Sequence, residues 1–518
     1  MDLLKYFPYN SFRPFQEEAI LKIDKAFNDG YKYVILESPT GSGKSAIAMT
    51  IALNMHDAYL LTSQKVLQDQ YIKDFTRNQD IKVLKGRSNY PCVALNEKED
   101  CSKGICAVQK CTLIPNCHYY IARNAALKAE VALLNYSYFL KVKNFQSDVF
   151  KSRKLLIQDE AHKIGNDLMN HVEFRLSEIY LDRLGIVSKI PLFNKIEEYI
   201  SWIEEIKLLI SERVHKFIQD ISDIYYVNEE KAKELIEEKE RLETLRENMD
   251  FFLGSFETTP WIFDIEKSEK LKKKTIIFKP LTVSDFAYDK LFSGGEKNLL
   301  MSATILDYKS FTNNLGINQN EAKFIRVPST FPIENRKIYF TNTGRMSYKE
   351  IDNTLPNIVK DIKKILEYHK GEKGIIHTHS YKISHYLEEN LDDNRLIFHD
   401  TETREEAFKK HCKYNDDSVL VSPSMTDGID LPDDLARFCV IIKLPYPSLA
   451  DKQVKMRMEM DRDWYIWLTC LSIIQSSGRG IRHEEDYCTI YLMDSGMKNF
   501  IKYNRKNFPD YFINSIKN

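Results

Sequence analysis

A glycine-rich stretch near the amino terminus, residues 37–45 (ESPTGSGKS), constrains the fold more than any other part of the chain. It follows an apolar run, Tyr33 to Leu36, and precedes a run of helix formers that begins at Ala46. A strand, a glycine turn and a helix in this order form the context of a phosphate-binding loop. Backbone N–H groups of such a loop surround phosphate oxygens, and the helix points its positive end at them. The stretch therefore predicts a nucleoside triphosphate site, and the nucleotide-binding residues expected here are Thr40, Gly41, Ser42, Gly43, Lys44 and Ser45.

Two of these side chains have distinct expected roles. Lys44 would reach the β- and γ-phosphates, and the Ser45 hydroxyl would bind Mg²⁺. Ser38 replaces the usual first glycine, and an ordinary glycine–serine turn is the alternative interpretation. Some twenty residues upstream, Arg13 and Gln16 stand at a predicted helix start, where they could read an adenine edge.

Length and charge limit the remaining possibilities. The 518 residues are enough for three or four domains, each with its own core. The 74 basic and 75 acidic residues nearly cancel, so a nucleic-acid partner would need a local basic surface. There is no twenty-residue apolar span and no secretory pattern at the amino terminus. A soluble, cytoplasmic protein without a membrane partner is expected.

Five of the nine cysteines fall between residues 92 and 117. In a reducing compartment such a group indicates metal ligation before disulfides. Zinc modules usually pair their ligands in short knuckles, which are lacking here, whereas single, spread cysteines suit an iron–sulfur cubane. Zinc and unliganded thiols stay open as alternatives. The cysteines are Cys92, Cys101, Cys106, Cys111 and Cys117.

A second catalytic element is predicted at residues 155–162. The apolar run Leu155 to Gln158 resembles a buried strand, and Asp159 and Glu160 follow it directly. Adjacent acids at a strand end are typical of the Mg²⁺-holding element of an NTPase. Asp159 would hold the ion through water, and Glu160 would polarise the attacking water. A helix N-cap pair is the structural alternative.

The pattern of predicted helices and strands then changes twice along the chain. Residues 163–285 read as an inserted helical block, with apolar positions such as Ile203, Ile206 and Val214 at three- and four-residue steps. After a strand ending in Ser302, Ala303 and Thr304, strand and helix patterns alternate again, which predicts a second parallel sheet. Its expected strands are Ile338–Thr341, Gly374–His379, Leu396–His399, Ser418–Val421, Cys439–Leu444 and Thr489–Met493.

Residues 475–482 (QSSGRGIR) belong to this second predicted sheet domain and contain two arginines. Arg479 and Arg482 lie three apart, a spacing that places both on one helical face. Two arginines there could meet a γ-phosphate held by a facing domain. Surface arginines at a helix end are the alternative.

The order of these motifs resembles the XPD/DinG family of superfamily 2 helicases from Arg13 almost to the end of the chain. The matching segments are RPFQ (13–16), SPTGSGKS (38–45), KGRSNYPC (85–92), LLNY (133–136), DEAH (159–162), LMSAT (300–304), HTHSY (377–381), PSMTDGIDLP (423–432) and QSSGRGIR (475–482). The resemblance implies an α/β protein with two RecA-like parallel-sheet domains, an inserted iron–sulfur domain and an inserted helical arch domain. Its expected pieces are residues 1–84, 121–165 and 286–315 for the first RecA-like domain, 85–120 for iron–sulfur, 166–285 for the arch and 316–518 for the second RecA-like domain.

The resemblance also implies ATP-driven 5′→3′ unwinding of DNA. ATP and Mg²⁺ would lie between the two RecA-like domains, contacted from the second by Gln475, Arg479 and Arg482, with Gly428 and Asp430 nearby. Ser302, Ala303 and Thr304 would couple hydrolysis to domain movement. The DNA would be a single strand or a forked or 5′-tailed duplex, with stacking on tyrosines at 90, 119, 120 and 136. A monomer of prokaryotic or viral origin is expected.

For the metal, the resemblance implies a 4Fe–4S cluster that stiffens a wedge at the point where the duplex parts. The implied ligands are Cys92, Cys106, Cys111 and Cys117, which leaves Cys101 outside in a polar, flexible stretch. A register shifted by one cysteine stays open, because Cys101 and Cys106 repeat the same gap. Two other functions also stay open: a single-strand translocase that clears proteins without unwinding, and a zinc-bound nucleic-acid-binding protein with a vestigial ATPase.

Overall fold

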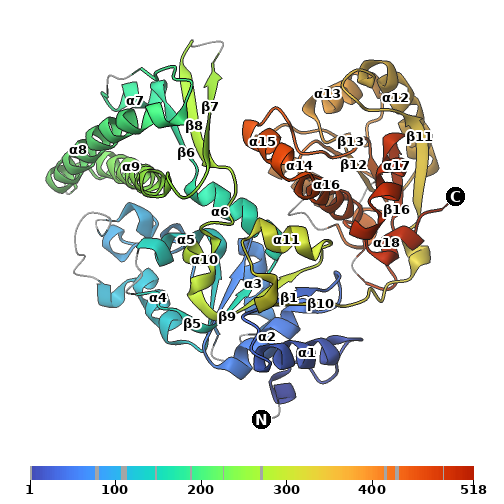
Figure 1. The fold of residues 1–518 in the computed structure, drawn as a ribbon, viewed down its shortest axis with the longest axis horizontal. Helices are drawn as coiled ribbons and strands as arrows, with labels where there is room; N and C mark the ends of the chain where they lie inside the picture. Colours follow the sequence, from blue (N-terminus) through green and yellow to red (C-terminus); the bar gives the residue numbers. More distant parts are fainter. Residues whose placement is uncertain are drawn as a thin grey trace.

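The protein contains two parallel sheets with helices around them and an inserted lobe, whose strands β7 (Trp261–Lys267) and β8 (Lys274–Pro280) lie beside α15 (Lys452–Met460) of the second domain (Figure 1). The computed structural model describes residues 3–75, 81–104, 106, 114–145, 149–186, 189–225, 227–268, 272–413, 417–425, 431–481 and 483–517. None of the helices in those ranges is long and apolar enough to cross a membrane.

The first sheet has seven parallel strands in the order β10-β1-β9-β5-β2-β4-β3. The strands β1 and β2 are buried at every position and β4 is buried at all but its last, as expected for strands covered by helices on both faces. The strands are β1 (Tyr33–Glu37), β2 (Ala58–Thr62), β3 (Ile81–Val83), β4 (Val131–Asn135), β5 (Arg153–Gln158), β9 (Gly295–Ser302) and β10 (Ala322–Arg326). The helices are α1 (Gln16–Asn28), α2 (Lys44–Met55), α3 (Lys65–Phe75), α4 (His118–Lys128), α5 (Tyr136–Phe145), α6 (Ile164–Val172), α10 (Ala287–Lys290) and α11 (Tyr308–Asn314).

The strand register places the predicted motifs at one edge of this sheet. In parallel pairs, Glu37 at the end of β1 lies opposite Ser302 at the end of β9, and Gln158 at the end of β5 lies opposite Leu300 of β9. The carboxyl ends of parallel strands meet at the same edge, which is where ligands bind in open α/β sheets. The phosphate loop, the two acids and Ser302 therefore converge, although they are spread over more than 250 residues of sequence.

The second sheet has six parallel strands in the order β11-β16-β15-β12-β14-β13. Each of the six predicted strands is present, although several are shorter than expected. The strands are β11 (Ile338–Gly344), β12 (Gly374–His377), β13 (Leu396–Ile397), β14 (Val419–Ser422), β15 (Phe438–Ile441) and β16 (Thr489–Asp494). The helices are α12 (Ile351–Tyr368), α13 (Tyr381–Asn390), α14 (Arg404–Lys413), α15 (Lys452–Met460), α16 (Arg462–Ser477), α17 (Gly496–Tyr503) and α18 (Asp510–Asn514).

The boundary expected after residue 315 is too early. Residues Ala322–Arg326 form β10, which pairs along its whole length with β1 of the first sheet. The crossing to the second domain therefore lies between Arg326 and Ile338. This strand escapes sequence analysis because the charged residues Lys323 and Arg326 interrupt its apolar pattern, as is usual for an edge strand.

The inserted lobe is not purely helical. Its long helices α8 (Ile200–Ile224) and α9 (Glu229–Ser255) pack together, and the predicted apolar positions Ile203, Ile206 and Val214 are buried. Beside them lie α7 (Glu178–Arg183) and an antiparallel sheet in the order β6-β8-β7 (Figure 1). Its strands are β6 (Phe174–Ser177), β7 (Trp261–Lys267) and β8 (Lys274–Pro280).

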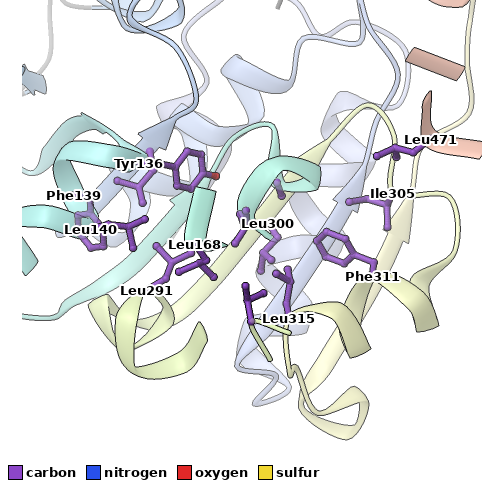
Figure 2. Close-up of a cluster of buried hydrophobic side chains, with 14 of the residues drawn as sticks. Tyr136, Phe139, Leu140, Leu168, Leu291, Leu300, Ile305, Phe311, Leu315 and Leu471 are labelled. Atoms are coloured by element: carbon purple, nitrogen blue, oxygen red, sulfur yellow. The ribbon is translucent and has the colours of Figure 1, made fainter. Parts of the chain in front are cut away.

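One hydrophobic cluster joins the two parallel-sheet domains. Figure 2 shows residues of the first domain such as Tyr136, Leu300 and Ile305 together with Leu471 of α16. The indole of Trp467, also on α16, donates a hydrogen bond to the Ile305 carbonyl at 2.8 Å. Helix α16 is thus the part of the second domain that packs on the strand-end edge of the first.

Candidate functional site

The phosphate loop has the backbone conformation that its sequence predicts. Gly41 and Gly43 both adopt φ of 78°, a left-handed conformation that favours glycine, and α2 begins at Lys44. A Cβ added at Gly43 would collide with the Gln16 side chain. The Lys44 ammonium donates to the Ser38 carbonyl at 3.1 Å, and the Ser38 and Ser42 hydroxyls are 2.7 Å apart. Ser38, the departure from the usual glycine, is fully buried and helps to tie the loop together.

Arg13 and Gln16 brace this loop from the start of α1. The Arg13 guanidinium donates to the Gly41 carbonyl at 2.6 Å, and the Gln16 amide donates to the Gly43 carbonyl at 3.2 Å. The amide oxygen of Gln16 accepts from the Arg13 backbone N–H at 2.7 Å. Both side chains lie against the phosphate loop, and their polar atoms contact the loop itself.

The two acids follow β5 directly. Asp159 is buried and accepts a hydrogen bond from the Tyr71 hydroxyl at 3.2 Å. Burial, with the neighbouring charge of Glu160, raises the pKa of Asp159 to about 6. Because Lys44 acts in the opposite direction on that carboxyl, the phosphate-loop lysine and the strand-end acid face one site. Tyr71 was not predicted, and nothing local marks it, because the contact joins residues 88 positions apart.

The pKa of Glu160 is shifted in the opposite direction from that of Asp159. Burial works against its ionisation, but the positive charges of His162, Lys44 and Arg479 outweigh it, so the pKa of Glu160 is lowered. Its backbone takes φ of 55°, unusual for a residue with a side chain, which turns the chain sharply at the strand end. An ionised carboxylate at this position is suited to accept a proton from water.

An ion pair and three hydrogen bonds connect Glu160 to the second domain through a short relay. His162 Nδ1 lies 3.3 Å from Glu160 Oε2 and 2.8 Å from Ser302 Oγ. Ser302 Oγ accepts from the Thr304 backbone N–H at 3.0 Å. Thr304 Oγ1 in turn lies 3.5 Å from Gln475 Nε2 on α16. Ala303 lies between the two hydroxyl residues and is half-buried.

The second-domain residues fall at the end of α16. Arg479 lies close enough to the first domain for its charge to lower the pKa of Glu160. The expectation that Arg479 and Arg482 share a helical face is wrong, because α16 ends at Ser477 and Arg479 lies in the turn after it. Glycines make this turn possible: a Cβ at Gly480 would overlap the Ala436 carbonyl. The predicted site residues Arg482, Gly428 and Asp430 lie outside the described residues.

Four thiols converge between β3 and α4. Cys92, Cys101 and Cys117 are buried, and Cys106 Sγ lies 4.0 Å from the Cys101 carbonyl. A Cβ added at Gly104 would lie 2.8 Å from Cys92 Sγ and 3.7 Å from Cys106 Sγ, so only glycine leaves the space between the thiols open. The expectation of a flexible Cys101 is wrong: its side chain has no exposed surface, and its backbone N–H donates to the Tyr90 carbonyl at 2.8 Å. Cys111 lies outside the described residues.

The thiols of Cys92 and Cys106 lie beside Gly104, and Cys106 and Cys117 are electrostatic neighbours of Cys101, so this group offers the soft ligands that an iron–sulfur centre takes. The segment is also held against the inserted lobe. Lys233 of α9 lies 3.4 Å from Glu99, and Arg87 lies 3.9 Å from Glu240 of α9.

Two of the four tyrosines proposed to stack on bases cannot do so in this structure. Tyr119 and Tyr136 are only 2% and 1% exposed, and the Tyr136 hydroxyl donates to the Asp159 carbonyl at 2.9 Å. Tyr90 and Tyr120 are half-buried and keep an accessible edge. Sequence analysis missed this difference because aromatic residues serve cores and stacking sites equally well.

Comparisons with known proteins agree with this arrangement. Residues 10–200 match the family described as type III restriction enzyme, res subunit, and residues 362–515 match the helicase C-terminal domain family. The solved structure "XPD_Helicase" superposes with a TM-score of 0.68 at 19% identity, covering 96% of this chain and 98% of that one. The S. tokodaii Xpd4 structure gives 0.60 at 17% identity, covering 98% and 99%. Fold and site together define a superfamily 2 helicase-type protein with two RecA-like domains.

The relatives narrow this class. The ATP-dependent DNA helicase YoaA of Haemophilus influenzae is 22% identical over 98% of this chain and 94% of its own length. The chain belongs to the XPD/DinG family of superfamily 2 helicases. The ATP-dependent DNA helicase CHL1 of Saccharomyces cerevisiae is 23% identical over 76% of this chain, and the match spans about half, 55%, of CHL1.

Proposed function

We propose that the protein is an ATP-dependent DNA helicase that moves 5′→3′ along single-stranded DNA and separates duplex. The observation that carries this proposal is the relay from Glu160 through His162, Ser302 and Thr304 to Gln475. It connects the acid beside the phosphate loop to a helix of the other domain. A change of charge at the acid therefore has a direct route to the packing of α16, as a motor needs. The polarity rests on the family resemblance.

The nucleotide chemistry follows from the residues around the loop. Lys44 and the loop N–H groups bind the phosphates, and Ser45 and Asp159 would hold Mg²⁺, which neutralises charge on the phosphate oxygens. Glu160 orients the attacking water and takes its proton, in keeping with its lowered pKa. Arg479 approaches the same acid from the second domain, where it can stabilise charge that develops on the γ-phosphate; Arg482 is proposed to act beside it. Gly428 and Asp430 are proposed to complete the nucleotide side of the second domain.

The thiols are proposed to hold a 4Fe–4S cluster, which would stiffen the segment that acts as a wedge. Cys92, Cys106 and Cys117 belong to both candidate ligand sets. The convergence of Cys101 with them supports Cys101 as the fourth ligand, whereas the spacing favours Cys111.

Ion pairs between this segment and α9 support a path for single-stranded DNA that runs between the segment and the inserted lobe. The proposed partners are single-stranded DNA and forked or 5′-tailed duplex, bound by a monomer.

The decisive experiment is strand separation on forked, 5′-tailed and 3′-tailed duplexes of identical sequence, with the Lys44→Ala protein as background. Unwinding of the forked and 5′-tailed substrates only is the expected result. Equal activity on the 3′-tailed duplex would contradict the polarity. DNA-stimulated ATP hydrolysis and displacement of a bound protein without strand separation would identify a translocase. Binding should also weaken by about 0.7 log units per log unit of salt for each neutralised phosphate.

A further inference from the structure

Tyr71 of α3 connects the two residues that are proposed to hold Mg²⁺. Its hydroxyl donates to Asp159 Oδ2 at 3.2 Å. Burial raises the pKa of Tyr71 well above its usual value, and a hydrogen bond with the Ser45 side chain counteracts this rise. A bond that lowers the pKa of a phenol is one that the phenol oxygen accepts, so Ser45 donates to Tyr71. One hydroxyl group on a third segment therefore joins the start of α2 to the acid after β5.

The position of the Tyr71 hydroxyl is fixed by the packing of its ring. Tyr71 is only 2% exposed and belongs to a hydrophobic cluster that includes Ile47 of α2 and Leu60 of β2. The centre of its ring lies 5.8 Å from that of Phe75, one turn further along α3. Because the ring cannot turn toward water, its hydroxyl must find its hydrogen bonds at the strand-end edge of the sheet.

This arrangement suits the indirect support of a divalent cation. A serine hydroxyl that binds a cation directs a lone pair at the ion and needs an acceptor for its proton, which the Tyr71 oxygen provides. The Tyr71 proton in turn holds Asp159 Oδ2, while Asp159 Oδ1 accepts from the Glu160 backbone N–H at 3.0 Å. Each carboxylate oxygen then has one fixed partner and keeps a lone pair for the ion or its water. Groups that orient metal ligands in this way control the affinity for the metal.

We infer that Tyr71 is a positioning residue for the divalent cation of the nucleotide site, where it orients the Ser45 hydroxyl and the Asp159 carboxylate without contacting the ion. The inference rests on the proposed nucleotide site and adds a residue to its metal-binding part. It also makes α3 part of the response to the metal, in addition to the phosphate loop and the acids after β5.

The test is metal binding by the full chain with bound ADP and without DNA, with Mn²⁺ in place of Mg²⁺ so that electron paramagnetic resonance reports the free ion. Tyr71→Phe keeps the ring and removes the hydroxyl. It should lower the Mn²⁺ affinity by about tenfold, a loss typical of removing the partner of a metal ligand. The affinity for fluorescent mant-ADP in EDTA should not change, because the phosphate loop is intact.

Tyr59→Phe is the matched control. Tyr59 is also 2% exposed, and its hydroxyl donates to the Lys151 carbonyl at 3.1 Å, so the variant loses an equally buried hydroxyl that is not bonded to a proposed metal ligand. Its Mn²⁺ affinity should equal that of the wild type. Unchanged Mn²⁺ affinity in Tyr71→Phe would overturn the inference. An equal loss of mant-ADP affinity in EDTA would also overturn it, because the hydroxyl would then support the whole site rather than its metal.

Hydrogen–deuterium exchange of the wild type needs no variant and covers the case in which Tyr71→Phe does not fold. ADP with Mg²⁺ should slow amide exchange in α3 relative to ADP in EDTA, because the ion fixes the partners of Tyr71. Slowing confined to residues 38–48 and 157–162 would contradict the inference. If the wild type bound nucleotide without any effect of Mg²⁺, the proposed nucleotide site would fail together with the inference. Failure of strand separation with the Tyr71 effect intact would reject the helicase proposal alone.

Discussion

His162 and Ser302 are 140 positions apart in sequence, yet His162 Nδ1 lies 2.8 Å from Ser302 Oγ at the edge of the first sheet. The same ring nitrogen lies 3.3 Å from Glu160, so the histidine contacts both the acid and the strand that leads to α16.

His162→Ala should therefore uncouple ATP hydrolysis from its stimulation by single-stranded DNA. Basal ATP turnover should persist at neutral pH, because Lys44, Lys163 and Arg479 still favour the ionised form of Glu160 when the His162 charge is lost. The stimulation by single-stranded DNA should fall by about tenfold or more, the loss typical of one hydrogen-bonded link. Steady-state hydrolysis with and without a saturating oligonucleotide measures this. His385→Ala, at an exposed histidine of α13, should leave both rates unchanged. Full stimulation in His162→Ala would exclude the relay.

Lys44→Ala should abolish ATP hydrolysis and leave single-strand binding intact. The ammonium lies within the loop, 3.1 Å from the Ser38 carbonyl, and the proposed strand path runs elsewhere. Hydrolysis assays and fluorescence anisotropy with a labelled oligonucleotide report the two properties separately. Lys73→Ala, on the exposed side of α3, provides the control. More than a few per cent of residual DNA-stimulated turnover would remove the loop from the mechanism.

Arg479→Ala should lower kcat far more than it raises KM for ATP. The arginine acts on Glu160 from across the domain interface, where charge develops only as the phosphoryl group transfers. Arginines of this kind contribute about 10³–10⁵ in rate in other phosphoryl-transfer systems. Saturation kinetics distinguish the two parameters, with Arg505→Ala as an exposed control. A change in KM alone would mark Arg479 as a ground-state ligand.

Asp159→Asn should stabilise the protein while it abolishes hydrolysis. The pKa of the buried carboxyl rises from 3.8 to about 6 on folding, so folding favours its protonated form. The stability that this form provides is complete below about pH 4 and is lost as pH rises through 6. The variant should thus exceed the wild type by up to about 3 kcal/mol above pH 7, and the difference should vanish near pH 4. Urea unfolding in EDTA measures it.

The exposed Asp74→Asn serves as the control for that experiment and should show no pH-dependent gain. A stability difference between Asp159→Asn and wild type that is independent of pH would show that the carboxyl is not protonated on folding. A loss of stability above pH 7 would show that Lys44 or another cation compensates the buried charge fully.

Two variants distinguish whether Cys101 or Cys111 is the fourth cluster ligand. Cys101→Ser should be pale after anaerobic purification, because its thiol lies with those of Cys92, Cys106 and Cys117, while Cys111→Ser should stay brown. Iron content and absorbance near 400 nm give the result, and Cys412→Ser, a cysteine of α14, is the control. The opposite pattern would support the set inferred from spacing, and zinc in the wild type would exclude the cluster. Pale protein should still hydrolyse some ATP but unwind poorly.

Local sequence determined a large part of this protein. The phosphate loop, the acids after β5 and all six strands of the second sheet could be predicted, because each depends on a short pattern. Glycines permit a left-handed turn, and an apolar run of four to six residues with turn residues at its ends forms a buried strand. Parallel pairing then brings the strand ends to one edge, so the convergence of the nucleotide site was implicit in the motif order.

Contacts between residues far apart in sequence were decided by the tertiary structure alone. It placed Ala322–Arg326 beside β1, Tyr71 against Asp159 and Cys101 among the other thiols, and it ended α16 before Arg479. It also brought Arg336 and Tyr511 to the phosphate loop. No local pattern encodes these contacts, because a tyrosine or an arginine has the same sequence signature whether it packs, pairs or binds a ligand. Which of these it does is decided by the free energy of burying it beside a particular neighbour, and only the folded chain supplies that neighbour.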